Sequence, residues 1–243
     1  MPEPEAQALS LARMLAAPPA FPRLERMATR ALARLYRLAG LERYDDYRLE
    51  RVAGLRLLVT PSVFNPRLLR TGAFFATQLD AQLLGAGSEV LDMGTGSGVC
   101  ALAAARHAAR VVAVDINPAA VLCARLNAQH NGLEARVSIR AGDLFEATAG
   151  ERFDRVLFNP PFVRGVPRSA RERAWCATDV AERFAAGLRA HLRPGGCALL
   201  LLSSYGDSGH YLRELARQRF ALTPVAARRF VGERLVLFRA DPT

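Results

Sequence analysis

The stretch Val90-Leu-Asp-Met-Gly-Thr-Gly-Ser-Gly98 decides the fold class. In it, an apolar strand ends in an acid, and a glycine-rich loop then leads into a helix. Gly94, Gly96 and Gly98 permit the positive φ angles and close backbone approach that ligand-binding loops use. The GxGxG spacing differs from the GxGxxG of dinucleotide-binding folds, and Asp92 at the mouth of the loop favours a cationic ligand over a phosphate. Taken alone, the loop is equally compatible with a tight turn in any α/β protein.

From Ser88 onward, apolar strands alternate with helices. This order predicts an α/β fold with a Rossmann-like, seven-stranded, mostly parallel sheet that helices cover on both faces. The last two strands lie too close together for an intervening helix, so we expect an antiparallel C-terminal hairpin. The expected strands are Glu89–Met93, Arg110–Asp115, Val137–Ala141, Arg155–Asn159, Ala198–Ser203, Thr223–Ala227 and Leu235–Arg239. The expected helices are Val99–Arg106, Pro118–Gln129, Asp179–Leu192 and Gly209–Gln218.

The first 60 residues form a different region. Residues 1–50 are expected to be helical, and apolar residues from Leu24 to Leu38 recur at helical spacing beside a parallel stripe of arginines. Tyr47–Val59 contains two short strand-like runs around Ala53-Gly54, which predicts a hairpin. A further helix should begin at Asn65-Pro66 and run to about Leu84. We expect an N-terminal helical cap with a hairpin over residues 1–60, on the substrate side, and the main domain over residues 61–243.

Composition is that of a soluble globular protein. The chain has 243 residues, of which 51% are hydrophobic and 23% charged, and its apolar runs are too short for a membrane helix. The N-terminus lacks a basic secretory leader, so we expect a cytoplasmic protein without a membrane partner.

The net charge is +10, and every basic residue is arginine, which reflects either codon bias or attraction to an anionic partner. Four widely spaced cysteines without a CxxC pair predict neither a metal site nor a disulfide framework.

Two more acids end the next two strands. Asp115 can accept hydrogen bonds from both hydroxyls of a ribose, and Asp143 can accept one from an adenine amino group, although Asp143 alone could be a helix cap. Carboxyl ends of parallel strands meet at one edge of a sheet, so these acids and the glycine loop should form one crevice. Together the motifs, which cover Ser88 to Ser203, resemble the class I S-adenosylmethionine-dependent methyltransferases.

That resemblance implies S-adenosyl-L-methionine as cofactor, S-adenosyl-L-homocysteine as product, and no metal. The glycine loop would back the methionine portion, with Asp92 near its ammonium. Pro61-Ser-Val-Phe-Asn-Pro66 with Thr71 resembles a segment of the HemK-like family, which implies that Thr71 lies beside the cofactor's carboxylate. Asp115 would bind the ribose, and Ile116 would pack on the adenine. The complete set of expected cofactor-binding residues is Thr71, Asp92, Gly94, Thr95, Gly96, Gly98, Asp115, Ile116, Asn117, Asp143, Leu144 and Asn159.

Asn159-Pro-Pro-Phe162 follows the fourth predicted strand. The two prolines remove backbone donors, which leaves the Asn159 side-chain oxygen and the Pro160 carbonyl as acceptors for both hydrogens of an NH2 group. Phe162 offers a face on which a planar group can stack. Positive charge grows on the attacking nitrogen, so fixed acceptors stabilise the transition state more than the ground state. Asn159, Pro160 and Phe162 are therefore the candidate catalytic residues.

This tetrad is similar to the N-P-P-[FYW] signature of amino-group methyltransferases, and the closing segment Arg229 to Arg239 resembles that of the HemK-like family. The resemblance implies N-methylation of a planar amide or amino nitrogen, with protein glutamine as the first hypothesis. An RNA or DNA adenine or guanine enzyme, a small-molecule N-methyltransferase of specialised metabolism, and a catalytically silent partner subunit stay open, as does the oligomeric state. The expected substrate-binding residues are Pro161, Phe162, Arg164, Arg168 and Trp175.

Overall fold

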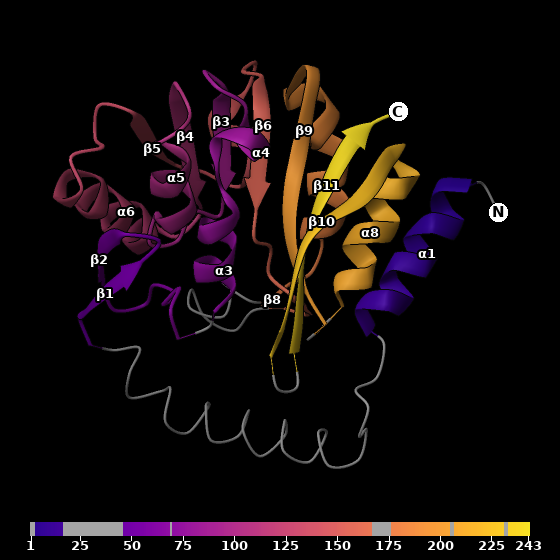
Figure 1. Ribbon diagram of the computed structural model, residues 1–243, viewed down its shortest axis with the longest axis horizontal. Coiled ribbons are helices and arrows are strands. Elements are labelled where there is room, and N and C mark those ends of the chain that lie inside the picture. The colour runs from indigo at the N-terminus through magenta and orange to yellow at the C-terminus, as the bar shows by residue number, and fades with distance from the viewer. Residues whose placement is uncertain (1–2, 17–45, 69, 167–175, 205–206, 231–232) are drawn as a thin grey trace, which may run out of the picture.

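The computed structural model describes residues 3–16, 46–68, 70–166, 176–204, 207–230 and 233–243. A seven-stranded sheet with the order β10-β11-β9-β6-β3-β4-β5 forms its centre, with helices on both faces (Figure 1). The neighbouring pairs among β5, β4, β3, β6 and β9 are parallel, whereas β11 runs antiparallel to both β9 and β10. The predicted fold class, including the antiparallel C-terminal hairpin, is confirmed.

The described elements have the following bounds. The strands are β1 Arg48–Val52, β2 Leu55–Val59, β3 Glu89–Met93, β4 Arg110–Asp115, β5 Val137–Ala141, β6 Phe153–Phe158, β7 Val163–Arg164, β8 Cys176–Ala177, β9 Leu192–Ser203, β10 Phe220–Phe230 and β11 Glu233–Pro242. The helices are α1 Glu3–Ala16, α3 Thr71–Gln78, α4 Ala81–Leu84, α5 Val99–Ala104, α6 Pro118–His130, α7 Val180–Leu188 and α8 Ser208–Arg217, with short 3₁₀ turns at Leu144–Thr148 and Arg189–His191.

The core consists of two apolar layers, one on each face of the sheet. The two layers arise because successive side chains of a strand point to opposite faces of the sheet. In β3, Leu91 and Met93 lie in the layer that contains Phe184 of α7, whereas Val90 lies in the layer that contains Phe75 of α3. The central strands contribute buried apolar side chains to both layers, as expected for a covered parallel sheet.

The helix expected from Asn65 to Leu84 is broken, so that prediction is wrong in its extent. The Asn65 carboxamide does accept hydrogen bonds from the amides of Arg67 and Leu68, but this cap closes only a turn. Arg70 then adopts a left-handed conformation with φ 62°, and α3 begins after it. A second break follows α3, where Asp80 caps the separate helix α4 through the Leu83 amide. Two local caps thus divide what sequence periodicity presents as one helix.

The N-terminal region contributes to both ends of the molecule. α1 packs against α8 at one end, whereas the β1–β2 hairpin lies beside α6 at the other (Figure 1). The hairpin is confirmed, and Ala53 and Gly54 form its two-residue turn with φ angles of 49° and 74°. The predicted stripes between Arg23 and Leu38 fall in residues 17–45, outside the described residues. The division at residue 60 stays a prediction.

Two smaller differences concern the rest of the sheet. The strands β9, β10 and β11 extend further than the sequence pattern indicates, and the short parallel pair β7–β8 was not expected. None of the helices in the described ranges is long and apolar enough to cross a membrane.

Candidate active site

The glycine loop between β3 and α5 closes one side of a cavity at the carboxyl edge of the sheet. Gly94 and Gly96 have φ angles of 65° and 56°, which side chains with a Cβ rarely adopt. The Thr95 amide donates to the Val114 carbonyl at 3.0 Å, and the Gly96 amide donates to Asp115 Oδ2 at 2.8 Å. The loop is therefore held against the end of β4.

Most of the predicted site residues line this one cavity. They come from the ends of β3, β4, β5 and β6 and from the start of α3, which the parallel topology brings to the same edge. The predicted residues on the cavity wall are Thr71, Asp92, Gly94, Thr95, Gly96, Asp115, Ile116, Asn117, Asp143, Leu144, Asn159, Pro160, Pro161 and Phe162. Ser62, Val63 and Phe64, from the loop after β2, also line it.

Gly98 does not lie on that wall. It has a φ of 84°, and a Cβ added there would be 3.2 Å from the Cβ of Ala124 in α6. The contact between helix and loop, rather than a ligand, accounts for glycine at this position.

Asp92 is buried beneath the loop, with 3% of its surface exposed. Its Oδ2 accepts hydrogen bonds from the Thr95 hydroxyl at 2.6 Å and from the Ala101 amide at 3.0 Å. Burial raises the pKa of Asp92 to about 7, because the charged form loses its hydration, and the nearby Asp115 carboxylate adds to the increase. Asp92 thus ties the loop to α5 and also presents a titratable group at the cavity wall.

Asp115 ends β4 and is also buried. Its two oxygens accept from the backbone amides of Gly96 and Asn117, at 2.8 and 2.9 Å. Burial raises the pKa of Asp115, and these amide donors partly oppose that effect. Asn117 in turn caps α6 by accepting from the Ala119 amide. The carboxylate is therefore fixed in one orientation at the cavity wall.

Asp143 occupies the N-cap position of the 3₁₀ turn Leu144–Thr148, but its side chain makes no cap hydrogen bond there. Instead its Oδ2 accepts from the Arg183 guanidinium of α7 at 2.7 Å. Sequence reasoning missed this ion pair, which joins residues 40 positions apart. The pairing raises the pKa of Arg183 and holds the Asp143 carboxylate at the edge of the cavity.

The tetrad Asn159-Pro-Pro-Phe162 follows β6 and forms another part of the cavity wall. The Asn159 Nδ2 donates to the Thr71 hydroxyl at 3.3 Å, so the donor end of the carboxamide is engaged and its oxygen is the end left to accept. The Pro160 carbonyl has no hydrogen-bond donor among the described residues, and Pro160 lines the cavity. The arrangement is a pair of acceptors beside the half-buried ring of Phe162.

Asn127 joins α6 to the hairpin strand β2. It lies within α6, is fully buried, and exchanges two hydrogen bonds with the Leu58 backbone in β2 while also donating to the Ser97 carbonyl. Asn131, one turn later, pairs with Arg56 in the same way. Two asparagines spaced four residues apart on one helix face are the signal that could have indicated this junction.

The structure describes little of the other predicted substrate-binding residues, Arg164, Arg168 and Trp175. Arg168 and Trp175 lie outside the described residues, and nothing is described of the Arg164 side chain beyond its position in β7.

The four cysteines are all buried and free.

Comparison with known proteins places this chain in a family. The model of the methyltransferase small domain matches residues 54–223. The release factor glutamine methyltransferase of Moorella thermoacetica is 40% identical over 145 residues, which are 53% of this chain and 50% of that protein. The putative protein N5-glutamine methyltransferase MJ0928 of Methanocaldococcus jannaschii is 29% identical over 201 residues, 78% of this chain and 96% of that protein.

A solved structure is similar as well. The T. thermophilus 16S rRNA N2 G1207 methyltransferase (RsmC), in complex with AdoMet and guanosine, superposes with a TM-score of 0.62 at 26% identity, covering 82% of this chain and 50% of that chain. The chain spans about half the length of the first curated relatives that it matches. Because the family model covers more than half of its residues, this chain belongs to the methyltransferase small domain family.

Proposed function

We propose that the chain is an S-adenosylmethionine-dependent N-methyltransferase that acts on a planar amide or amino nitrogen. The cofactor's methionine portion would lie against the loop from Gly94 to Gly96, and its ribose hydroxyls would face Asp115. Asp143 would accept from the adenine amino group, and Ile116 would pack on the ring. The bound cofactor supplies an electrophilic methyl group on a sulfonium.

The observation that carries this proposal is the pair of acceptors in the tetrad. Thr71 engages the Asn159 amide nitrogen, so the Asn159 oxygen is the atom left for a donor, and the neighbouring Pro160 carbonyl has no donor among the described residues. An NH2 group that donates to both oxygens has its lone pair turned away from them. Stacking on Phe162 would hold the planar group in that pose, and the fixed acceptors stabilise the positive charge that grows on nitrogen.

Protein glutamine is the acceptor that we propose first. Its carboxamide has the planar NH2 group that the tetrad requires, and the relatives named as glutamine methyltransferases reach 41% identity. An amino group of an RNA base is the second candidate. It is favoured by the net charge of +10 and by the similarity to an rRNA guanine N2 methyltransferase.

Transfer of a radioactive methyl group from S-adenosylmethionine into a cell lysate tests the proposal. After incubation, the lysate is separated into protein, RNA and small molecules, and Asn159→Ala serves as the matched control. We expect label in protein, on the nitrogen of glutamine, and much less with the variant. Label in RNA would support the second candidate, and label in small molecules would remove both macromolecular acceptors. Cofactor binding without any transfer would indicate a silent partner subunit.

A further inference from the structure

The tetrad is attached to the rest of the molecule through its carbonyl oxygens. Pro160 and Pro161 have no amide hydrogen, so at these two residues the backbone can only accept hydrogen bonds. The Phe162 carbonyl accepts from the Asp207 amide at 2.9 Å, and the Pro161 carbonyl accepts from the Tyr211 hydroxyl at 3.0 Å. Two successive carbonyls are thus engaged, whereas no described residue donates to the preceding one, that of Pro160.

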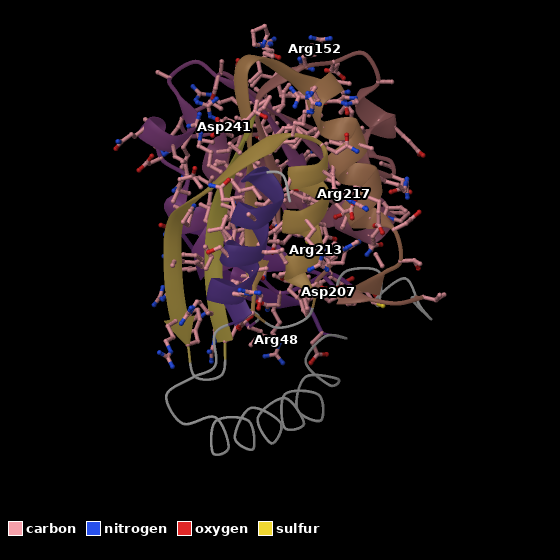
Figure 2. All side chains as sticks on the ribbon, turned by 90° about the vertical axis from the view of Figure 1, so that its right-hand side faces the viewer. Arg48, Arg152, Asp207, Arg213, Arg217 and Asp241 are labelled. Carbon is pink, nitrogen blue, oxygen red and sulfur yellow. The ribbon has the colours of Figure 1, made fainter. Side chains whose placement is uncertain are left out.

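Both donors belong to the first turn of α8. Asp207 is its N-cap residue, and Figure 2 shows it at one end of that helix, with Arg213 and Arg217 further along. α8 packs against α7 and the sheet through Leu212 and Leu215, which are buried. The Asp207 amide and the Tyr211 hydroxyl therefore belong to a helix that the apolar core holds in place.

The Tyr211 hydroxyl is well suited to a fixed donor role. The residue is 6% exposed, and its ring meets the ring of Phe158, the residue before the tetrad, edge-on with centroids 6.3 Å apart. Burial raises the pKa of Tyr211 above its ordinary value, and the charge of Glu182 raises it further, so the hydroxyl keeps its proton. A neutral, buried hydroxyl next to a carbonyl can donate a hydrogen bond to it.

Anchoring one carbonyl has a consequence for its neighbour. The ring of Pro161 holds its φ at about −65°, so ψ of Pro161 is the one soft torsion left between the Pro160 carbonyl and the Pro161 carbonyl. Fixing the first restricts the direction of the second. We propose that Tyr211 is a positioning residue for the transfer reaction: its hydroxyl holds the Pro161 carbonyl and thereby directs the Pro160 carbonyl toward the acceptor nitrogen. The inference rests on the function proposed above.

Tyr211→Phe removes the hydroxyl and keeps the ring. We expect kcat for methyl transfer to fall about tenfold, the scale of one lost hydrogen bond that orients a reacting group. The Kd for S-adenosylmethionine, measured by calorimetry, should stay within twofold, because Tyr211 is not part of the cofactor cavity. Leu212→Val is the matched control, since Leu212 is the next residue of α8, is buried, and has no polar group to offer the tetrad. Its kcat should equal that of the parent.

Four outcomes would overturn the inference. Tyr211→Phe with the parent kcat would show that the hydroxyl positions nothing. An equal loss of kcat in Leu212→Val would mean that both substitutions act through general packing of α8. A weakened affinity of Tyr211→Phe for S-adenosylmethionine would mean that Tyr211 acts on the cofactor site and not on the Pro160 carbonyl. If the unmodified chain binds S-adenosylmethionine but transfers no methyl group to any lysate fraction, the proposed function itself fails, and the positioning role fails with it.

Discussion

Replacement of Asp92 by asparagine measures the free energy that it costs to bury the charged carboxylate beneath the glycine loop. The shift of its pKa from 3.8 to about 7 corresponds to about 4 kcal/mol at about 1.4 kcal/mol per pKa unit. Between these two values the folded protein holds a proton that the unfolded chain has released. Stability therefore falls as the pH rises from about 4 to about 7, and the loss is complete above that range.

Asparagine keeps the geometry and removes the charge. Its carboxamide oxygen can accept from the Thr95 hydroxyl and the Ala101 amide, the two donors that Asp92 Oδ2 engages. We expect Asp92→Asn to be more stable than the parent by about 4 kcal/mol near pH 8 and by little near pH 4. Urea denaturation of both proteins across this range measures the difference. Glu134→Gln, at an exposed position, should follow the parent at every pH.

A difference between parent and Asp92→Asn that is independent of pH would refute this reasoning. It would mean that the change acts through packing or hydrogen bonding, and that Asp92 ionises in the folded protein as it does in the unfolded chain.

Two further predictions concern stability around the site. Asn127→Ala should reduce the free energy of unfolding by about 2 to 4 kcal/mol, because it leaves the buried backbone groups of Leu58 and Ser97 without partners; a change below about 0.5 kcal/mol in urea denaturation would contradict the role assigned to it. Gly98→Ala should cost about 1 to 3 kcal/mol through its positive φ and the contact with Ala124. Gly87→Ala, also at positive φ but in open space, should cost less in the same assay.

The sequence was sufficient to predict the elements that depend on local patterns. Alternation of apolar strands and helices predicted the sheet, and acids at successive strand ends predicted that Asp92, Asp115 and Asp143 share one cavity wall. This succeeds because parallel topology, once inferred, brings strand ends to the same edge. The tetrad was found in the same way, since it follows β6 directly.

The sequence did not reveal contacts between elements that are distant along the chain. The Asp143–Arg183 pair, the Asn127 junction with β2 and the Tyr211 hydrogen bond to Pro161 each depend on how helices pack on the sheet. Helical periodicity indicates which face is buried but not which polar atom of a neighbour it meets.

A single-turnover measurement of methyl transfer by Asn159→Ala tests the proposed role of Asn159 most directly. The measurement uses saturating S-adenosylmethionine and the acceptor fraction identified in the lysate. We expect a rate about 100-fold or more below that of the parent, the scale of one lost polar contact to a transition state. The cofactor Kd, measured on the same protein, should stay within a few-fold of the parent value. Transfer at the parent rate would contradict the claim that Asn159 accepts a hydrogen bond from the target nitrogen.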